Sequence, residues 1–217
     1  DQRLSRGLGD VYKRQTNNSP FNSTAEFENL KEEDYNSTFS FMEEENNRSI
    51  RFMELIDEYE KLSYEDFKEI KYDQQYPDSI LYIGNISQIF DLDKSEFPNY
   101  ENLIDLIQNW DRRGDIENIG AAQWSLYYSY MLNVLSENDL NVKDTIDIKF
   151  HLDALEKTKA RLMNNFGKLD IRLGDIQRLV RGDKSLPVSG LIDMIAPTYS
   201  VPMEGGKVRA VSGESYI

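Results

Sequence analysis

Residues 117–136 read ENIGAAQWSLYYSYMLNVLS, and a helix wound from them is apolar on nearly every side. A helix that lacks a polar face must be surrounded by protein. We therefore predict that this stretch forms the central core helix of the molecule. Its aromatic side chains Trp124, Tyr127, Tyr128 and Tyr130 favour a buried core, although the same residues would also suit a groove for a partner protein.

Apolar residues recur at helical spacing on the N-terminal side of this stretch. One helix is predicted from Arg48, and a shorter one follows Ser63, which has a capping-box pattern with Asp66 and opens a helix through Ile70. We expect Asn99 to cap a third helix. The first helix carries the stripe Ile50, Met53 and Ile56, and the third carries Leu103, Leu106, Ile107 and Trp110.

A long helix is predicted on the C-terminal side, and Gly167 supplies the left-handed residue that ends it. Frequent glycines and prolines interrupt the chain after Gly167. They are too many for helices, and the alternating runs are too few for a full sheet. We therefore expect an extended, packed segment that ends in a strand at Val211 or at residues 215–217. The stripe of the long helix is Ile148, Leu152, Leu155, Leu162 and Phe166.

The predicted fold class is α+β, with most of the chain helical and the C-terminal segment irregular or extended. Residues 16–47 are rich in Asn, Ser, Thr and Glu, which predicts an ordered loop region. Residues 71–98 are predicted to be a second irregular connection with a short helix near 86–90.

The composition excludes several kinds of function. The chain of 217 residues has a formal net charge of −14 and lacks the clustered Lys and Arg that nucleic-acid binding needs. The absence of cysteine excludes disulfides, thiolate metal sites and cysteine nucleophiles. His151 stands alone, which argues against a histidine metal cluster and a self-contained Ser-His-Asp triad. We expect His151 to pack in the structure or lie on its surface.

Residues 5–15, SRGLGDVYKRQ, resemble the translation of a transposon end that is used as an adaptor in sequencing libraries. We interpret residues 1–15 as non-native and exclude them from the fold. Residues 16–217 are then an internal part of a longer protein, incomplete at both ends.

Three separated stretches resemble the penicillin acylase family of N-terminal-nucleophile hydrolases. The first is Asn-Asn-Ser-Pro at 17–20, followed by NRSIRFMEL at 47–55, and the second is LIQNWD at 106–111. The third includes GDIQR at 174–178 and GESY at 213–216, and it resembles the branch that contains acyl-homoserine lactone acylases. The resemblance implies part of a β chain of the αββα, or Ntn-hydrolase, fold.

The resemblance also implies a mechanism for cleaving a linear amide. A serine at the free N-terminus of the β chain attacks, and its own α-amine takes the hydroxyl proton through a water. By the same resemblance, Asn17 donates a hydrogen bond to the oxyanion and Arg48 orients the site. A register slip of one residue would put Asn18 in place of Asn17. Internal serines such as Ser19 have no free amine, so the nucleophile is expected to be missing from this chain.

The implied partners are a small-molecule N-acyl amide as substrate, and the α chain and the remainder of the β chain from the same precursor. No catalytic cofactor is implied, whereas a structural calcium ion is compatible with the parent enzyme. Relatives are exported precursors, so the resemblance implies a periplasmic or extracellular location.

Some residues depart from the family pattern. Leu173 replaces a usual Trp, Ile192 stands where a Pro or Gly is expected, and the loop of residues 21–47 is longer than in penicillin G acylase. The acyl group of the substrate is therefore not specified. Two alternatives remain open. The first is a non-catalytic helical module with an interaction or structural role. The second is a family member that has lost catalysis.

Overall fold

The structure is a computed structural model. The residues that it describes do not include the predicted non-native segment at 1–15, nor Asn17 and Asn18. Short 3-10 helices, η1 (Pro20–Asn22) and η3 (Glu32–Asp34), occur in the described part of the predicted loop region. The described residues are 19–22, 29–36, 45–81, 84–140, 145–202 and 208–212.

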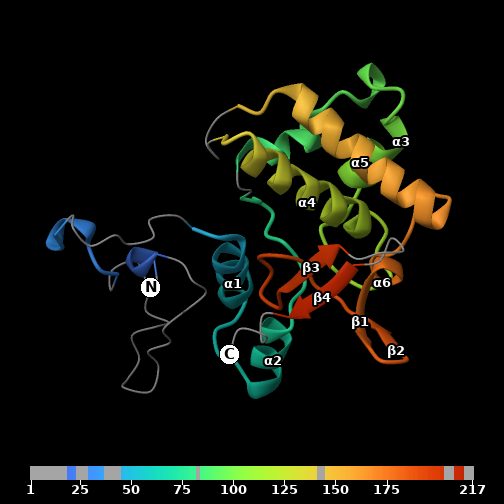
Figure 1. The fold of residues 1–217 in the computed structure, drawn as a ribbon. Coiled ribbons are helices and arrows are strands. Elements are labelled where there is room, and N and C mark those ends of the chain that lie inside the picture. The colour runs from blue at the N-terminus through green and yellow to red at the C-terminus, as the bar shows by residue number, and fades with distance from the viewer. Residues whose placement is uncertain are drawn as a thin grey trace.

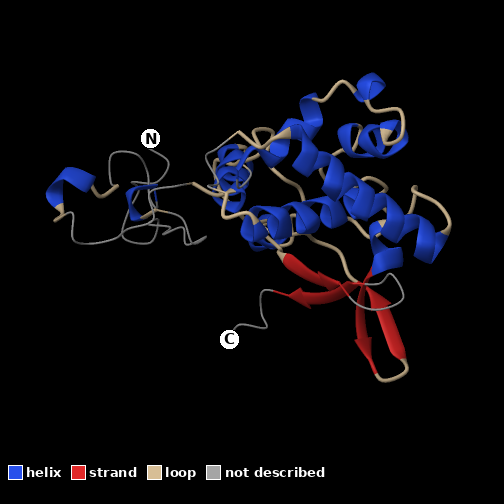
Figure 2. Cartoon of the chain, turned by 45° about the horizontal axis from the view of Figure 1, so that its top comes forward, coloured by secondary structure: helices blue, strands red, loops and turns tan. Residues whose placement is uncertain are grey.

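The described chain is mostly helical, and a small sheet follows the helices (Figure 1). Figure 2 shows the helices on one side of the molecule and the strands on the other. No helix in these described ranges is long and apolar enough to cross a membrane. The helices are α1 (Asn47–Asp57), α2 (Tyr64–Lys71), η4 (Gly84–Asp91), η5 (Lys94–Glu96), α3 (Glu101–Gln108), α4 (Ala121–Glu137), α5 (Ile148–Phe166) and α6 (Leu173–Ile176).

Helix α4 is the centre of the core, as its sequence predicts. Trp124 is 1% exposed, and its ring stacks on Trp110 of the preceding segment with centroids 6.0 Å apart. Tyr127 and Tyr128 are also buried, and Tyr130 is partly buried against the same cluster, so these aromatic side chains contribute to the core. Phe90 of η4 packs against Trp124 from a further direction. A helix that is apolar all round is thus covered on several sides.

The other predicted helices are found close to their expected positions. Ser63 accepts a hydrogen bond from the backbone N–H of Asp66, and Asp66 accepts one from Ser63, which confirms the capping box of α2. Gly167 has a φ of 70° and ends α5 as expected. The expectation for Asn99 is wrong, because Tyr100 is the N-cap of α3 and makes no side-chain capping hydrogen bond.

The C-terminal segment is extended as predicted, but it contains more sheet than expected. The strands are β1 (Gln177–Arg181), β2 (Lys184–Pro187), β3 (Thr198–Pro202) and β4 (Val208–Ser212), in the order β2-β1-β4-β3. The pairs β1–β2 and β3–β4 are antiparallel, and β1–β4 is parallel. A strand containing Val211 is confirmed, while residues 215–217 lie outside the described ranges. The strands are only four or five residues long, and prolines and glycines interrupt the chain between them, so the sequence gives a weak strand signal.

The start of α4 depends on Gly120. Its φ of 101° is unfavourable for residues with a side chain, and a Cβ there would lie 2.6 Å from the Cβ of Trp110. The buried side chain of Gln123 accepts from the Gly120 N–H at 2.7 Å and donates to the carbonyls of Leu169 and Ile171. The α3–α4 corner is therefore fixed both by close approach and by buried hydrogen bonds.

We predict that Gly120→Ala lowers the free energy of unfolding by about 3 kcal/mol, because left-handed strain and overpacking add together. Gly167→Ala is the matched control, since Gly167 also has a positive φ but nothing lies within 4 Å of its added Cβ. That control is expected to cost about 1 kcal/mol. Urea denaturation of both variants measures the difference, and equal losses would contradict the role of the Trp110 contact.

Candidate functional site

Arg48 lies in the first turn of α1, and its position follows from local capping. Asn46 is the N-cap residue, and its side-chain oxygen accepts from the Ser49 N–H at 2.9 Å. This places Arg48 at the second helical position. Its Nε donates to Oδ1 of Asp193 at 3.0 Å, across a sequence separation of 145 residues.

Asp193 connects the loop before β3 to the N-terminus of α1. Its Oδ2 accepts from the backbone N–H of Asn47 and from the Asn47 side-chain amide, both at 2.9 Å. A carboxylate at a helix N-terminus is stabilised by unpaired N–H groups and by the helix dipole. The same carboxylate therefore binds the end of the helix through one oxygen and Arg48 through the other.

Asn47 completes this junction. Its side chain is buried, and it donates to the carbonyl of Leu81 at 2.6 Å and accepts from the Leu81 N–H at 2.7 Å. With the bond to Asp193, three chain segments meet at one amide. Asn47-Arg48-Ser49 matches the N-glycosylation pattern Asn-X-Ser, but because this amide is buried and already bonded, the position is not suited to carry a glycan in this fold.

A second ion pair, about one helical turn further along α1, connects this helix to Asp73, which follows α2. Arg51 donates from Nε and from a terminal nitrogen to the two carboxylate oxygens of Asp73, at 3.1 and 3.2 Å. The pair is more buried than Arg48–Asp193, with side chains 16% and 14% exposed against 24% and 28%. Helix α1 therefore has a second tether, which does not involve Arg48.

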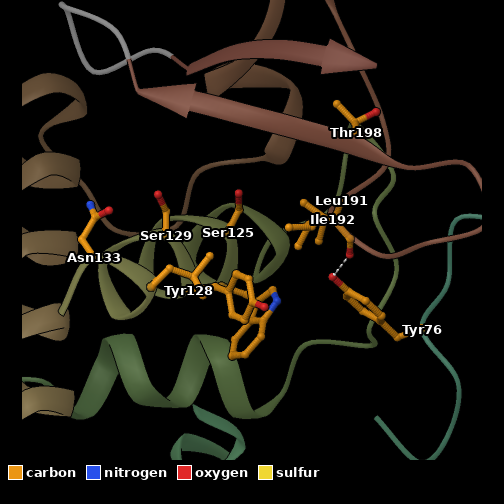
Figure 3. A pocket seen from close by; sticks show the side chains of 10 residues that line it. Tyr76, Ser125, Tyr128, Ser129, Asn133, Leu191, Ile192 and Thr198 are labelled. Carbon is orange, nitrogen blue, oxygen red and sulfur yellow. Dashed lines mark hydrogen bonds between the residues drawn. The ribbon is translucent and has the colours of Figure 1, made fainter. Parts of the chain in front are cut away.

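A small pocket lies between α4 and the β3–β4 pair, and it is lined in part by Ile192, the residue before Asp193 (Figure 3). Ser125 and Ser129 lie one turn apart on α4 and point toward the strands. Tyr128 also lines the pocket, and burial, followed by the negative charge of Asp193, raises the pKa of Tyr128 to about 12. The cavity volume of about 60 Å³ holds a few water molecules and is far below the usual size of a ligand pocket.

His151 is a packing residue and lies away from this pocket. It is 1% exposed, its Nδ1 is 2.5 Å from the Tyr127 hydroxyl, and its Nε2 is 3.1 Å from Oε1 of Gln88. Burial lowers the pKa of His151 to about 4, so the ring is neutral near pH 7. A neutral ring that accepts from Tyr127 and donates from Nε2 to Gln88 satisfies both contacts.

Of the two residues named from the sequence, only Arg48 lies among the described residues. Arg48 is placed at the N-terminus of α1, whereas Asn17 lies outside the described residues and its role stays a prediction. Asp193 and Asn47 were not identified from the sequence. Among the described residues no group of three or more His, Asp or Glu side chains suits a metal ion, and the structural calcium ion stays a prediction.

The chain matches the model of the penicillin amidase family over residues 12–216, which include α1, the pocket and the sheet. It therefore belongs to the penicillin amidase family, and this membership implies an acylase-type amide hydrolase. No curated protein matches the chain.

We predict that His151 makes the protein less stable in acid. The pKa is about 4 in the folded state and about 6.5 when unfolded, so between these values only the unfolded chain binds the proton. The free energy of unfolding should fall as the pH drops from 6.5 to 4, by roughly 3 kcal/mol in total. Urea denaturation at pH 7 and pH 4.5 measures this loss.

His151→Gln is the control, because glutamine can still accept from Tyr127 but does not titrate in this range. The variant should lose less stability than the wild type between the two pH values, whatever its stability at pH 7. Identical pH dependence in both proteins would show that His151 does not contribute.

Proposed function

We propose that this chain is part of an amide hydrolase that cleaves N-acyl amides of small amines through an acyl-enzyme. The family match over residues 12–216 is the observation that carries the proposal. N-acyl-homoserine lactones and the acyl side chains of β-lactams are the proposed substrate classes. The proposed nucleophile is a serine at the N-terminus of a processed β chain, on a part of the precursor outside these residues.

In the proposed reaction the serine oxygen bonds to the amide carbonyl carbon while the α-amine of the same serine takes the proton through a water. The carbonyl oxygen becomes an oxyanion, to which Asn17 donates a hydrogen bond. The C–N bond then breaks, and the amine leaves with the proton. Water next hydrolyses the ester and regenerates the serine.

Arg48 is proposed to orient this site. Its guanidinium is a planar fork of donors, and such a fork suits an amide oxygen or a polar group of the substrate. The ion pair with Asp193 and the position in the first turn of α1 restrict where this fork can lie. A structural calcium ion and an exported location remain parts of the proposal that rest on family resemblance alone.

Extending the reading frame upstream tests the proposal most directly. A processing junction that exposes a serine, some hundreds of residues before Thr16, is expected. The complete protein should then be purified and assayed against N-acyl amides that differ in acyl length. A complete gene with no such junction would remove the hydrolase mechanism. It would favour a family member that has lost catalysis, and stable one-to-one binding of a partner protein in a pull-down would then favour the interaction module.

We predict that Asn17→Ala lowers kcat of the complete, processed enzyme by about 100- to 1,000-fold, because one oxyanion donor typically contributes about 3–4 kcal/mol. Asn18→Ala is the matched control and should retain activity within a few-fold. Single-turnover release of the amine measures both variants. The reverse order of effects would assign the oxyanion donor to Asn18 instead.

A further inference from the structure

We propose that Asp193 is a positioning residue that holds the Arg48 guanidinium in its working orientation. This inference rests on the proposed function, since it concerns the same site. It starts from the ion pair between Arg48 and Asp193, which joins the first turn of α1 to the loop before β3. No feature of the sequence pattern near Asp193 indicates this role.

The geometry of the contact fixes a direction as well as a position. Asp193 meets Arg48 through Nε, at 3.0 Å, while its other oxygen is held by the backbone and side-chain amides of Asn47. The guanidinium is planar and rigid. Fixing Nε and the helical backbone of Arg48 therefore limits the directions that its two terminal nitrogens can take.

The backbone of Asp193 is itself held in an unusual conformation. Its φ is 60°, in the left-handed region that few residues with a side chain adopt, although Asp is among those that tolerate it. The preceding carbonyl, of Ile192, accepts from the Tyr76 hydroxyl, as Figure 3 shows. The Thr198 N–H donates to the Leu191 carbonyl at 3.1 Å and closes the loop.

Residues next to Asp193 anchor this loop through a buried side chain and hydrogen bonds. Met194 is 1% exposed, and its sulfur accepts from the Leu191 N–H at 3.3 Å. The Gly190 N–H donates to the Gly114 carbonyl at 2.7 Å, and a Cβ at Gly190 would lie 2.6 Å from the Ala196 carbonyl oxygen. The loop thus presents the Asp193 carboxylate to α1 without needing to rearrange.

Capping of α1 alone does not explain this arrangement. Asn46 already caps the helix, and the Arg51–Asp73 pair already tethers it. Asp193 adds an ion pair to the arginine that the proposed mechanism uses. If Asp193 were only another tether, the loss of the more buried Asp73 carboxylate should harm the enzyme at least as much.

The experiment uses the complete, processed enzyme and one N-acyl amide that the wild type hydrolyses. Asp193→Asn keeps an acceptor and tolerates the left-handed backbone, while Asp193→Gly removes the carboxylate and relieves the backbone strain. Both variants should lower kcat at least tenfold and change KM less than threefold. Asp73→Asn is the matched control, and its kcat should stay within twofold of the wild type.

A double variant distinguishes positioning from general damage. If Asp193 acts through Arg48, then Arg48→Ala combined with Asp193→Gly should be no slower than Arg48→Ala alone. Multiplicative losses in the double variant would overturn the proposal, as would an Asp193→Gly variant with the kcat of Asp73→Asn.

If Asp193→Asn does not accumulate, the Asp193→Gly comparison decides by itself. If neither Asp193 variant accumulates while Asp73→Asn does, Asp193 is a folding residue and the proposal fails.

The outcomes also separate this inference from the proposed function. A complete wild-type protein without amide hydrolase activity would defeat the function itself. An active wild type that is slowed by Arg48→Ala but not by the Asp193 variants would leave the function standing and remove only the role of Asp193.

Discussion

The burial of α4 is the constraint on which the remaining structure depends. Its sequence is apolar over most of its surface, so other segments must cover it, and the polar side chains of Asn133 and Ser136 are exposed near its C-terminal end. Helices α3 and α5 pack against it, and the segment with Leu191 and Ile192 lies beside the pocket on its other side. Covering α4 therefore brings the loop before β3 to a defined place, and with it the carboxylate of Asp193.

Hydrogen bonds from polar side chains of β1 fix how the C-terminal segment is arranged. The side-chain amide of Gln177 donates to the carbonyls of Val188 and Gly190, both at 2.8 Å, and so attaches the start of β1 to the loop. Arg178 donates to the Gly174 carbonyl and to the carbonyl and hydroxyl of Ser185. An unpaired buried carbonyl would be costly, so each of these bonds favours one arrangement of the segment. These bonds consequently attach β1 to β2, to α6 and to the loop that follows β2.

Local features of the fold could be predicted, and long-range ones could not. The Ser63 capping box and the Gly167 stop depend on residues within a few positions, and both are confirmed. The sheet was underestimated, because its order depends on pairings between distant short strands. At the site, Arg48 was named from family resemblance, whereas Asp193 is one of 39 acidic residues and no local pattern distinguishes it.

Arg48 and Asp193 lie 145 positions apart in the sequence, so the contact between them depends on the tertiary fold. A donor contributes most to catalysis when its orientation is fixed before the reaction, since no energy is then spent on reorganising it. Here the carboxylate that contacts Arg48 is presented by a loop in which Asp193 has a positive φ. The junction at α1 therefore exists only in the completed fold. A site of this kind links the accuracy of folding to the proposed activity, because a loop that packs incorrectly leaves Arg48 without this constraint on its direction.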